Sequence, residues 1–271
     1  MIDLKEKIVL ITGATSGIGL ACAYKYAELG AHLILTGRRM EKLQNIKLEI
    51  ENKYMIPVKI FSFDVSNMIQ VRDFDIFLKD EEIAPEIFIN NAGLALGMNP
   101  IQEGNVADWD TMINTNLKGL LYMVKAVLPN MIKANRGTIL NVGSIAGSQV
   151  YPMGNVYNAT KHAVKALTEA MNMDLLETNI RVCTIEPGAV HTEFSLVRFK
   201  GDQEKADNVY KGFKPLSAED VADIMVYMTT LPEHINIQSL LVTPTAQRSA
   251  TLIHKDEKAE YDVFSNFKGI K

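Results

Sequence analysis

Short apolar runs alternate along the chain with longer segments in which hydrophobic residues recur at helical spacing. Runs rich in Val, Ile and Leu between helical segments are typical of a parallel sheet that helices cover on both faces. We therefore predict a doubly wound α/β fold with a parallel sheet of about seven strands. The predicted strands are Lys7–Thr12, Ala31–Thr36, Val58–Phe63, Glu86–Asn90, Gly137–Val142, Arg181–Ile185 and Leu240–Val242.

One long, mixed stretch breaks this alternation, from Glu186 to about Phe213. Long segments of this kind inside a compact domain tend to be functional, so we predict that residues 186–213 form a lid over a substrate site. No Pro/Gly/Ser-rich linker or repeat divides the chain, which predicts a single domain over residues 1–254. Residues 255–271 are charged with scattered aromatic side chains, and either a frayed tail or an arm on a neighbouring subunit fits them.

Composition narrows the possible partners. With 28 basic and 32 acidic side chains, the chain has no positive field for nucleic acid or an anionic membrane surface, so a small molecule is the expected partner. No apolar run approaches the ~18 residues that span a bilayer, and the N-terminus does not resemble an export signal. The only cysteines, Cys22 and Cys183, are expected to be core residues of a cytoplasmic protein. We predict no metal site.

A glycine-rich turn follows the first predicted strand, in the sequence TGATSGIG (Thr12–Gly19). Glycines allow a tight turn, let backbone N–H groups approach a pyrophosphate, and direct the N-terminus of a helix at its negative charge. The spacing is Gly-x3-Gly-x-Gly and alone would be equally consistent with a structural turn. Its place between a strand and a helix favours a dinucleotide site.

Two arginines, Arg38 and Arg39, stand at the end of the second predicted strand. NAD enzymes carry an acidic residue there for the ribose 2′-hydroxyl, whereas guanidinium groups match the 2′-phosphate of NADP(H). The alternative is that both are solvated residues at a helix start. Asp64-Val65 and Asn90–Gly93 end the next two strands, and the carboxylate of Asp64 could accept the adenine amino group.

Tyr157 and Lys161 are four residues apart, which on a helix places a phenol and an ammonium on one face. An adjacent cation favours the phenolate and would bring an acid/base tyrosine towards neutral pH. Tyr210 and Lys214 repeat the spacing, but Pro215 disfavours helical geometry at Lys214. Tyr157 instead follows a strand that leads to Ser144, whose hydroxyl could bind the same substrate oxygen.

These motifs together resemble the short-chain dehydrogenase/reductase family. The resemblance is carried by TGATSGIG, NNAG (Asn90–Gly93), Asn116, Ser144, YNATK (Tyr157–Lys161) and PG (Pro187-Gly188), and it covers Lys7 to about Pro244. It implies a Rossmann-like fold, proton exchange by Tyr157 and orientation of the carbonyl or alcohol by Ser144. It also implies that Lys161 binds the nicotinamide ribose and lowers the pKa of Tyr157, and that Asn116 holds a water behind Lys161.

The motifs and the resemblance together assign the NADP(H) site to a larger set of positions. These are Gly13, Thr15, Ser16, Gly17, Ile18, Gly19, Arg38, Arg39, Asp64, Val65, Asn91, Ala92, Gly93, Tyr157, Lys161, Pro187, Gly188, Val190 and Thr192.

Two peptides, NNAGLALGMNP (Asn90–Pro100) and TEFSLVRFKGD (Thr192–Asp202), are similar to the NADP-dependent 3-hydroxy acid dehydrogenase branch. That branch acts on the 3-hydroxyl of serine, allo-threonine, 3-hydroxyisobutyrate or 3-hydroxypropionate, or on the corresponding semialdehydes. The resemblance implies a homotetramer built through helices around Val106–Lys133 and Val156–Thr178; core-facing helices of a monomer are the alternative. An acid substrate brings a carboxylate that needs a cation, and of the lid residues Arg198 and Lys200 we expect Arg198, with Ser144 and Tyr157, to bind the substrate.

Two other functions fit the same motifs. One is reduction of a different carbonyl, such as a 3-oxoacyl thioester or a sugar ketone. The other is a non-catalytic NADP(H) sensor. The four residues Asn116, Ser144, Tyr157 and Lys161 argue against a sensor, because such a protein needs the nucleotide pocket but no proton relay.

Overall fold

The computed structural model describes residues 2–256, and within them one parallel sheet has seven strands in the order β3-β2-β1-β4-β5-β6-β7. The strands are β1 (Ile8–Thr12), β2 (His32–Gly37), β3 (Val58–Ser62), β4 (Ile87–Asn90), β5 (Gly137–Val142), β6 (Ile180–Pro187) and β7 (Ser239–Val242). Each neighbouring pair is parallel. The doubly wound α/β prediction is confirmed, and the strand order reverses between β1 and β4, where such sheets bind ligands.

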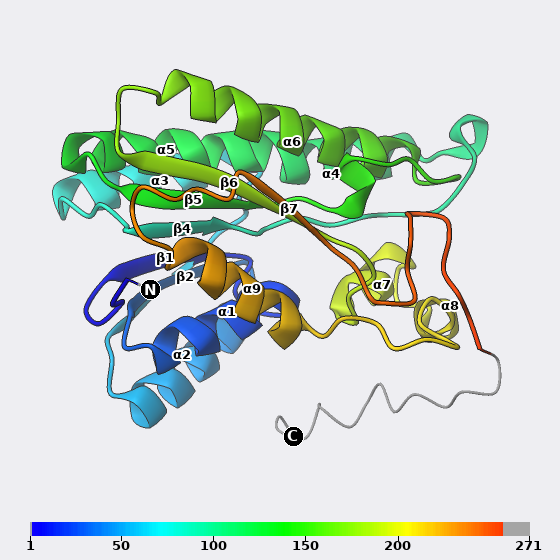
Figure 1. Ribbon diagram of the computed structural model, residues 1–271, viewed down its shortest axis with the longest axis horizontal. Helices are drawn as coiled ribbons and strands as arrows, with labels where there is room; N and C mark the ends of the chain where they lie inside the picture. The colour runs from blue at the N-terminus through cyan, green and yellow to red at the C-terminus, as the bar shows by residue number, and fades with distance from the viewer. Residues whose placement is uncertain (1, 257–271) are drawn as a thin grey trace.

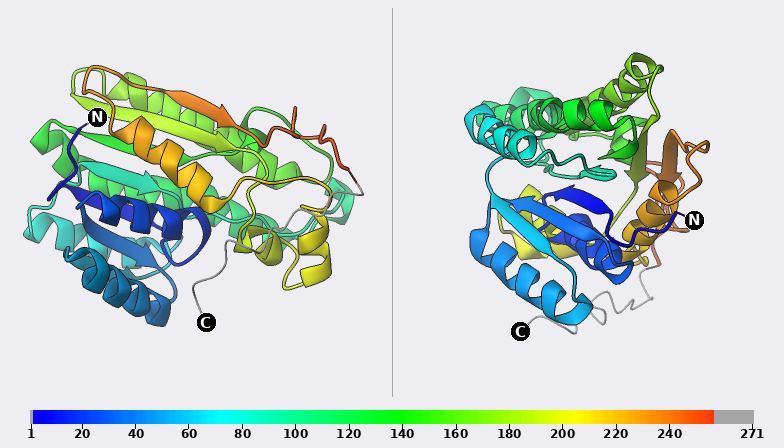
Figure 2. Two further views of the ribbon diagram at one scale, coloured as in Figure 1. Left: turned by 60° about the horizontal axis from the view of Figure 1, so that its bottom comes forward. Right: turned by 90° about the vertical axis from the view of Figure 1, so that its left-hand side faces the viewer.

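Helices cover both faces of this sheet (Figures 1 and 2). In the described part of the chain they are α1 (Gly17–Glu28), α2 (Met40–Tyr54), α3 (Met68–Asp80), α4 (Val106–Ile113), α5 (Leu120–Ala134), α6 (Asn155–Asp174), α7 (Glu193–Arg198), α8 (Gln203–Asn208) and α9 (Ala218–Thr229). Three shorter segments are η1 (Ile101–Glu103), the π-helical η2 (Asn114–Gly119) and η3 (Ile145–Gly147).

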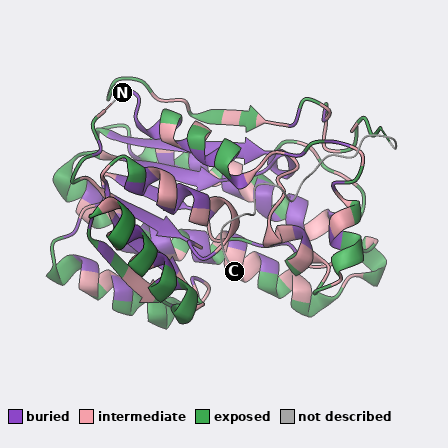
Figure 3. Cartoon of the chain, turned by 90° about the horizontal axis from the view of Figure 1, so that it is seen from below, coloured by how far each residue is buried: buried purple, intermediate pink, exposed green. Residues whose placement is uncertain are grey.

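The alternation of side chains along the strands builds a core on each face of the sheet. Val9 and Ile11 of β1 pack with α1, α2 and α9, whereas Leu10 between them packs with α3, α5 and α6. All three residues are fully buried, and Figure 3 shows the strands buried between helices whose outer surfaces are exposed. Burial on both sides explains why the strand sequences are almost continuously apolar.

Two segments differ from the sequence prediction. The helical stretch predicted around Val106–Lys133 is divided into α4 and α5 by the π-helical η2, and residues 186–213 contain the short helices α7 and α8. Hydrophobic periodicity missed these because a π-helical turn barely changes the pattern and the two lid helices have six residues each. Figure 1 shows α7 and α8 beside the end of the sheet, next to the strand β6 that leads into them.

The C-terminal prediction falls mainly on residues 257–271, which lie outside the described residues. The last described residue, Asp256, donates its backbone N–H to the carbonyl of Gly212 at the end of the lid segment (2.8 Å). Among residues 2–256, no helix is both long and apolar enough to pass through a bilayer.

Candidate active site

The glycine turn joins β1 to α1, and its conformation and packing require glycine. Gly13 and Gly17 have φ angles of +66° and +54°, which glycine adopts at little cost. A Cβ at Gly19 would lie 2.4 Å from the carbonyl oxygen of Gly13, so no larger residue fits there. Ser16 is the N-cap of α1 but makes no side-chain capping hydrogen bond. The turn therefore fits a pyrophosphate, which would meet glycine backbone and a helix N-terminus without a side-chain cap.

The predicted residues after β4 hold this turn in place. Asn91 donates its side-chain amide to the carbonyl of Thr12 (2.8 Å), and the backbone N–H groups of Asn91 and Ala92 donate to the Thr12 hydroxyl (2.9 and 3.0 Å). The ends of β1 and β4 are thereby joined at the point where the strand order reverses.

Arg38 and Arg39 lie between β2 and α2 and have different surroundings. The side chain of Arg38 is 64% exposed and lies 3.7 Å from the Asp64 carboxylate. Arg39 donates from Nε and Nη2 to the hydroxyl of Thr15 (3.0 and 2.8 Å) and from Nη1 to Glu193 in the lid segment (2.9 Å). Arg39 therefore connects the glycine turn to the lid.

Val65 and Asp64 follow β3 as predicted. Asp64 accepts hydrogen bonds from the backbone and hydroxyl of Ser66 (2.9 and 2.7 Å), and Val65 is buried against Gly119 of η2. Two further predicted coenzyme residues, Pro187 and Gly188, lie at the end of β6. Pro187 is its last residue, and a Cβ at Gly188 would lie 2.3 Å from the side-chain oxygen of Gln247.

Thr192 brings the start of the lid segment against the glycine turn. It caps α7 by accepting a hydrogen bond from the N–H of Phe194 (3.2 Å), and a Cβ at Gly17 would lie 3.2 Å from the Cβ of Thr192. Val190, two residues earlier, forms an isolated parallel bridge with Leu216. Ile18 lies in the first turn of α1, in the same helix N-terminus as Gly17 and Gly19.

Tyr157 and Lys161 occupy the first two turns of α6, both buried. The ammonium of Lys161 is 5.9 Å from the centre of the Tyr157 ring and donates to the carbonyl of Val142 (2.8 Å), the last residue of β5. Ser144 follows that strand, and its hydroxyl hydrogen-bonds Tyr157. The structure therefore brings together the phenol, hydroxyl and ammonium that the sequence singled out.

Asn116 lies in η2, behind Lys161. Its side-chain oxygen accepts from the N–H of Leu94 (2.8 Å), and its amide donates to the carbonyl of Leu94 (2.8 Å) and to the hydroxyl of Thr160 (3.1 Å). A Cβ at Gly93 would lie 3.2 Å from Asn116 Oδ1 and 3.6 Å from Lys161 Nζ, so both polar groups lie close to the Gly93 backbone. π-helical turns often occur at functional sites.

Burial is the largest cause of the pKa shifts of Tyr157 and Lys161. It raises the pKa of Tyr157, as does Tyr151, while the Ser144 hydrogen bond and the charge of Arg198 oppose the rise to a smaller extent. It lowers the pKa of Lys161 to about 8. The expectation that Lys161 lowers the pKa of Tyr157 stays a prediction. Removal of the phenolate from water outweighs the Ser144 hydrogen bond and the Arg198 charge, which both act in the opposite direction.

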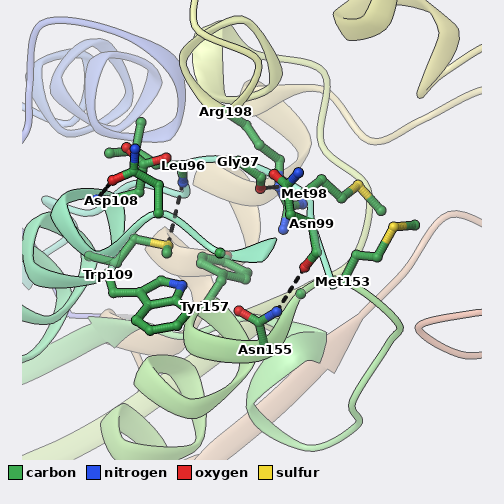
Figure 4. A pocket seen from close by; sticks show the side chains of 14 residues that line it. Leu96, Gly97, Met98, Asn99, Asp108, Trp109, Met153, Asn155, Tyr157 and Arg198 are labelled. Carbon is green, nitrogen blue, oxygen red and sulfur yellow. Dashed lines mark hydrogen bonds between the residues drawn. The ribbon is translucent and has the colours of Figure 1, made fainter. Parts of the chain in front are cut away.

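A pocket opens beside Tyr157, and Figure 4 shows the side chains around it. Its walls come from the residues after β4, from α4, from the start of α6 and from α7. They include Leu96, Gly97, Met98, Asn99, Asp108, Trp109, Met153, Asn155, Tyr157 and Arg198.

Arg198 is the cation of this pocket nearest to the tyrosine. Its guanidinium carbon lies 5.3 Å from the ring centres of both Tyr151 and Tyr157, and it hydrogen-bonds the Tyr151 hydroxyl. By contrast, Lys200 forms an ion pair with Asp108 (2.8 Å). The two cations therefore have different surroundings: Arg198 lines the pocket beside Tyr157, and Lys200 is paired with Asp108.

The repeated spacing at Tyr210 and Lys214 has a structural explanation. Neither residue is helical, and the Tyr210 hydroxyl donates to the carbonyl of Val190 (2.8 Å) and contacts the Ser195 hydroxyl (2.7 Å). Tyr210 thus packs within the lid segment. Sequence reasoning did not single out Trp109, Tyr151 or Glu193, because each depends on contacts between distant segments; the one available signal was that Glu193 follows the predicted coenzyme residue Thr192.

The chain is similar to several known proteins. Residues 7–202 match the family model for short chain dehydrogenase. The chain is 45% identical to an NADP-dependent 3-hydroxy acid dehydrogenase of Escherichia coli K12 over 92% of this chain and 99% of that protein. It is 45% identical to a sulfoacetaldehyde reductase of Chromohalobacter salexigens over 88% and 94%. The closed form of serine dehydrogenase complexed with NADP+ superposes with a TM-score of 0.85 at 44% identity, covering 92% of this chain and all of that one.

Proposed function

Because this chain belongs to the short-chain dehydrogenase family, we propose that it is an oxidoreductase that uses NADP(H) to interconvert the 3-hydroxyl and 3-oxo groups of small 3-hydroxy acids. The substrate class comprises serine, allo-threonine, 3-hydroxyisobutyrate and 3-hydroxypropionate. One observation carries the acid specificity: the guanidinium of Arg198 stands 5.3 Å from the ring of Tyr157, in the same pocket.

The coenzyme assignment rests on the relatives and on the fit of the site. The relatives include an NADP-dependent enzyme and a structure solved with NADP+. The glycine turn with the uncapped start of α1 suits the pyrophosphate, while Arg38 and Arg39 supply cations for the 2′-phosphate. When bound, the coenzyme supplies the hydride chemistry, and the protein supplies orientation and the proton.

Tyr157 is the residue that would exchange the proton with the substrate oxygen. Its raised pKa keeps the phenol protonated near neutral pH, which is the form that donates to a carbonyl oxygen during reduction. The Ser144 hydroxyl lies within hydrogen-bonding distance of this phenol and can bind the same oxygen. Lys161 and Asn116, packed around Gly93, would bind the nicotinamide ribose and relay protons behind Tyr157.

The names of the three relatives support a substrate that carries an anionic group. A 3-hydroxy acid and serine carry carboxylates, and sulfoacetaldehyde carries a sulfonate. Such a group is costly to bury unpaired, so a pocket for it needs a cation. Arg198 can hold it with two parallel hydrogen bonds and so fix the distance to the reacting carbon.

Initial rates with NADP+ test this function. The substrates are the four acids above, the uncharged methyl esters or amides of 3-hydroxyisobutyrate and 3-hydroxypropionate, and a 3-hydroxyacyl thioester. We expect kcat/KM to be highest for a free acid and at least about tenfold lower for its neutral counterpart. Equal or higher values for the thioester would instead identify the reductase of a different carbonyl, and no turnover of any substrate would point to a sensor.

A second candidate substrate is sulfoacetaldehyde. The observation that favours it is the 45% identity to a sulfoacetaldehyde reductase, together with a pocket cation that binds a sulfonate through the same hydrogen bonds as a carboxylate. Sulfoacetaldehyde with NADPH, and its alcohol with NADP+, should be added to the same panel. The kcat/KM values then compare the sulfonate substrates directly with the carboxylate substrates.

The proposal extends to assembly and location. A homotetramer would use exposed apolar side chains near two helices. These are Leu121 and Ile132 on α5, Met173 on α6, and Leu176 just after α6. Light scattering coupled to size exclusion measures the assembly directly. The cytoplasmic location remains a prediction that cell fractionation can test.

A further inference from the structure

The lid carboxylate Glu193 holds two cations of the coenzyme end of the site. One of its oxygens accepts from Nη1 of Arg39 (2.9 Å), and the other lies 3.2 Å from the ammonium of Lys42 in α2. Burial raises the pKa of Glu193, but the hydrogen bonds and charges of these two partners lower it by more. The carboxylate is therefore ionised at neutral pH, and both of its oxygens are in use.

Arg39 has little donor capacity beyond these contacts. Its Nε and Nη2 groups are turned to Thr15, through the hydroxyl (3.0 and 2.8 Å) and the carbonyl oxygen (3.1 Å), and Nη1 is turned to Glu193. A guanidinium has five N–H donors, and these four bonds leave one of them, on Nη1, so Arg39 can bind a second anion through two hydrogen bonds only if it releases one of these partners. Thr15 belongs to the glycine turn, which leaves Glu193 as the partner that can move.

We propose that Glu193 is a specificity-determining residue for the coenzyme: its carboxylate competes with the 2′-phosphate of NADP(H) for Arg39 and Lys42. This inference rests on the proposed NADP(H) site. A phosphate carries nearly two negative charges and three acceptor oxygens against the single charge of the carboxylate, so the phosphate wins the exchange. Two anions on one cation pair also repel each other, which gives Glu193 a direct effect on the affinity for NADP(H).

Replacement of Glu193 by the 2′-phosphate on Arg39 and Lys42 would also affect the substrate pocket, through α7. Glu193 is the first residue of α7 and Arg198, the pocket cation, is its last. The side chain of Glu193 is 43% exposed, so it can leave its partners without abandoning a buried position. NADP(H) would thus loosen the contact between α7 and the start of α2, whereas NAD(H), which has no 2′-phosphate, would leave it in place.

The test is a set of dissociation constants for NADP+ and NAD+, measured by calorimetry with the full chain and no substrate. Glu193→Gln removes the competing charge and should bind NADP+ about threefold to tenfold more tightly than wild type, with NAD+ unchanged within about twofold. Glu193→Ala should act in the same direction. The matched control is Asp202→Asn, because Asp202 is a lid carboxylate whose ionic partner is Lys205 (2.9 Å); it should change neither constant.

The outcomes separate this inference from the proposed function. If wild type binds NADP+ no more tightly than NAD+, the coenzyme assignment is wrong and the inference falls with it. If wild type prefers NADP+ but Glu193→Gln binds it equally or more weakly, the coenzyme assignment stands and the competition is refuted, leaving Glu193 only to align Arg39. Equal tightening of NADP+ and NAD+ also refutes it, because only NADP+ carries the 2′-phosphate.

Discussion

The guanidinium of Arg198 lies 5.3 Å from the centre of the Tyr157 ring, although Arg198 belongs to α7 and Tyr157 to α6. Arg198 also packs against the ring of Tyr151 at the same distance and hydrogen-bonds its hydroxyl. A guanidinium and a phenol therefore lie side by side, which the proposed binding of a substrate carboxylate and the proposed donation of a proton both require. This spacing can orient a short acid whose reacting carbon is two bonds from its carboxylate carbon.

Tyr157→Phe should lower kcat by about a hundredfold or more, because the change deletes the only proton that the phenol can exchange. The dissociation constant for NADP+ should stay within about twofold of wild type, since the ring and its packing remain. Steady-state kinetics and calorimetry measure the two quantities. Tyr210→Phe is the control and should keep most of kcat, because Tyr210 bonds within the lid segment; near-normal turnover in Tyr157→Phe would remove Tyr157 from the mechanism.

Arg38→Ala and Arg39→Ala should each reduce the preference for NADP+ over NAD+, read as the ratio of kcat/KM values, by roughly tenfold. The physical reason is the loss of a charge-assisted contact to the 2′-phosphate, which NAD+ does not have. Lys47→Ala serves as the control, because Lys47 is an α2 cation paired with Glu51 (3.0 Å). An unchanged ratio in both arginine variants would show that the 2′-phosphate binds elsewhere.

Oxidation of a hydroxy acid should speed up as the pH rises from 7 to 9, and reduction of the aldehyde should not. Burial raises the pKa of Tyr157, so the phenolate that accepts a proton from an alcohol is scarce at neutral pH and increases with each step in pH. A profile of kcat/KM against pH in both directions measures this. A flat profile for oxidation would show that a group other than Tyr157 takes the proton.

Lys161→Met should abolish activity and yet raise the free energy of unfolding at pH 7, by up to about 3 kcal/mol. Burial lowers the pKa of Lys161 to about 8, so the folded protein holds a disfavoured charge below that pH. The unfolded chain binds more protons between about pH 8 and the ordinary lysine pKa of about 10.4, so this penalty disappears as pH rises through that window. Urea unfolding at pH 7 and 9.5 measures the difference in free energy of unfolding between Lys161→Met and wild type. This difference should be smaller at pH 9.5, and an equal difference at both pH values would exclude the lysine charge as its cause.

Local patterns explain why the sheet, and the helix that carries Tyr157 and Lys161, could be predicted from the sequence. The apolar run Gly137–Val142 is recovered without change as β5, and Tyr157 with Lys161 lies on α6 as the four-residue spacing predicts. Strand ends converge on one edge of a parallel sheet, so motifs distant in sequence could be assigned to one site.

The parts that sequence did not predict depend on tertiary contacts. The pairing of Glu193 with Arg39 joins residues 154 positions apart, and no periodicity reports it. The direction of the Tyr157 pKa depended on how deeply the phenol is buried, which the spacing to Lys161 does not reveal. The division between α4 and α5 follows from hydrogen bonding in η2 that leaves the hydrophobic pattern almost unaltered.

The most direct test of acid recognition is Arg198→Met, compared with Lys200→Met, on a hydroxy acid and on its uncharged methyl ester. Methionine keeps much of the packing against Tyr151 and Tyr157 but removes the charge. Lys200 is a lid cation already paired with Asp108, so its loss should not discriminate between the two substrates. We predict that Arg198→Met raises KM for the acid at least about tenfold and leaves kcat/KM for the ester within about threefold of wild type. Equal losses on acid and ester, or none on either, would contradict the account.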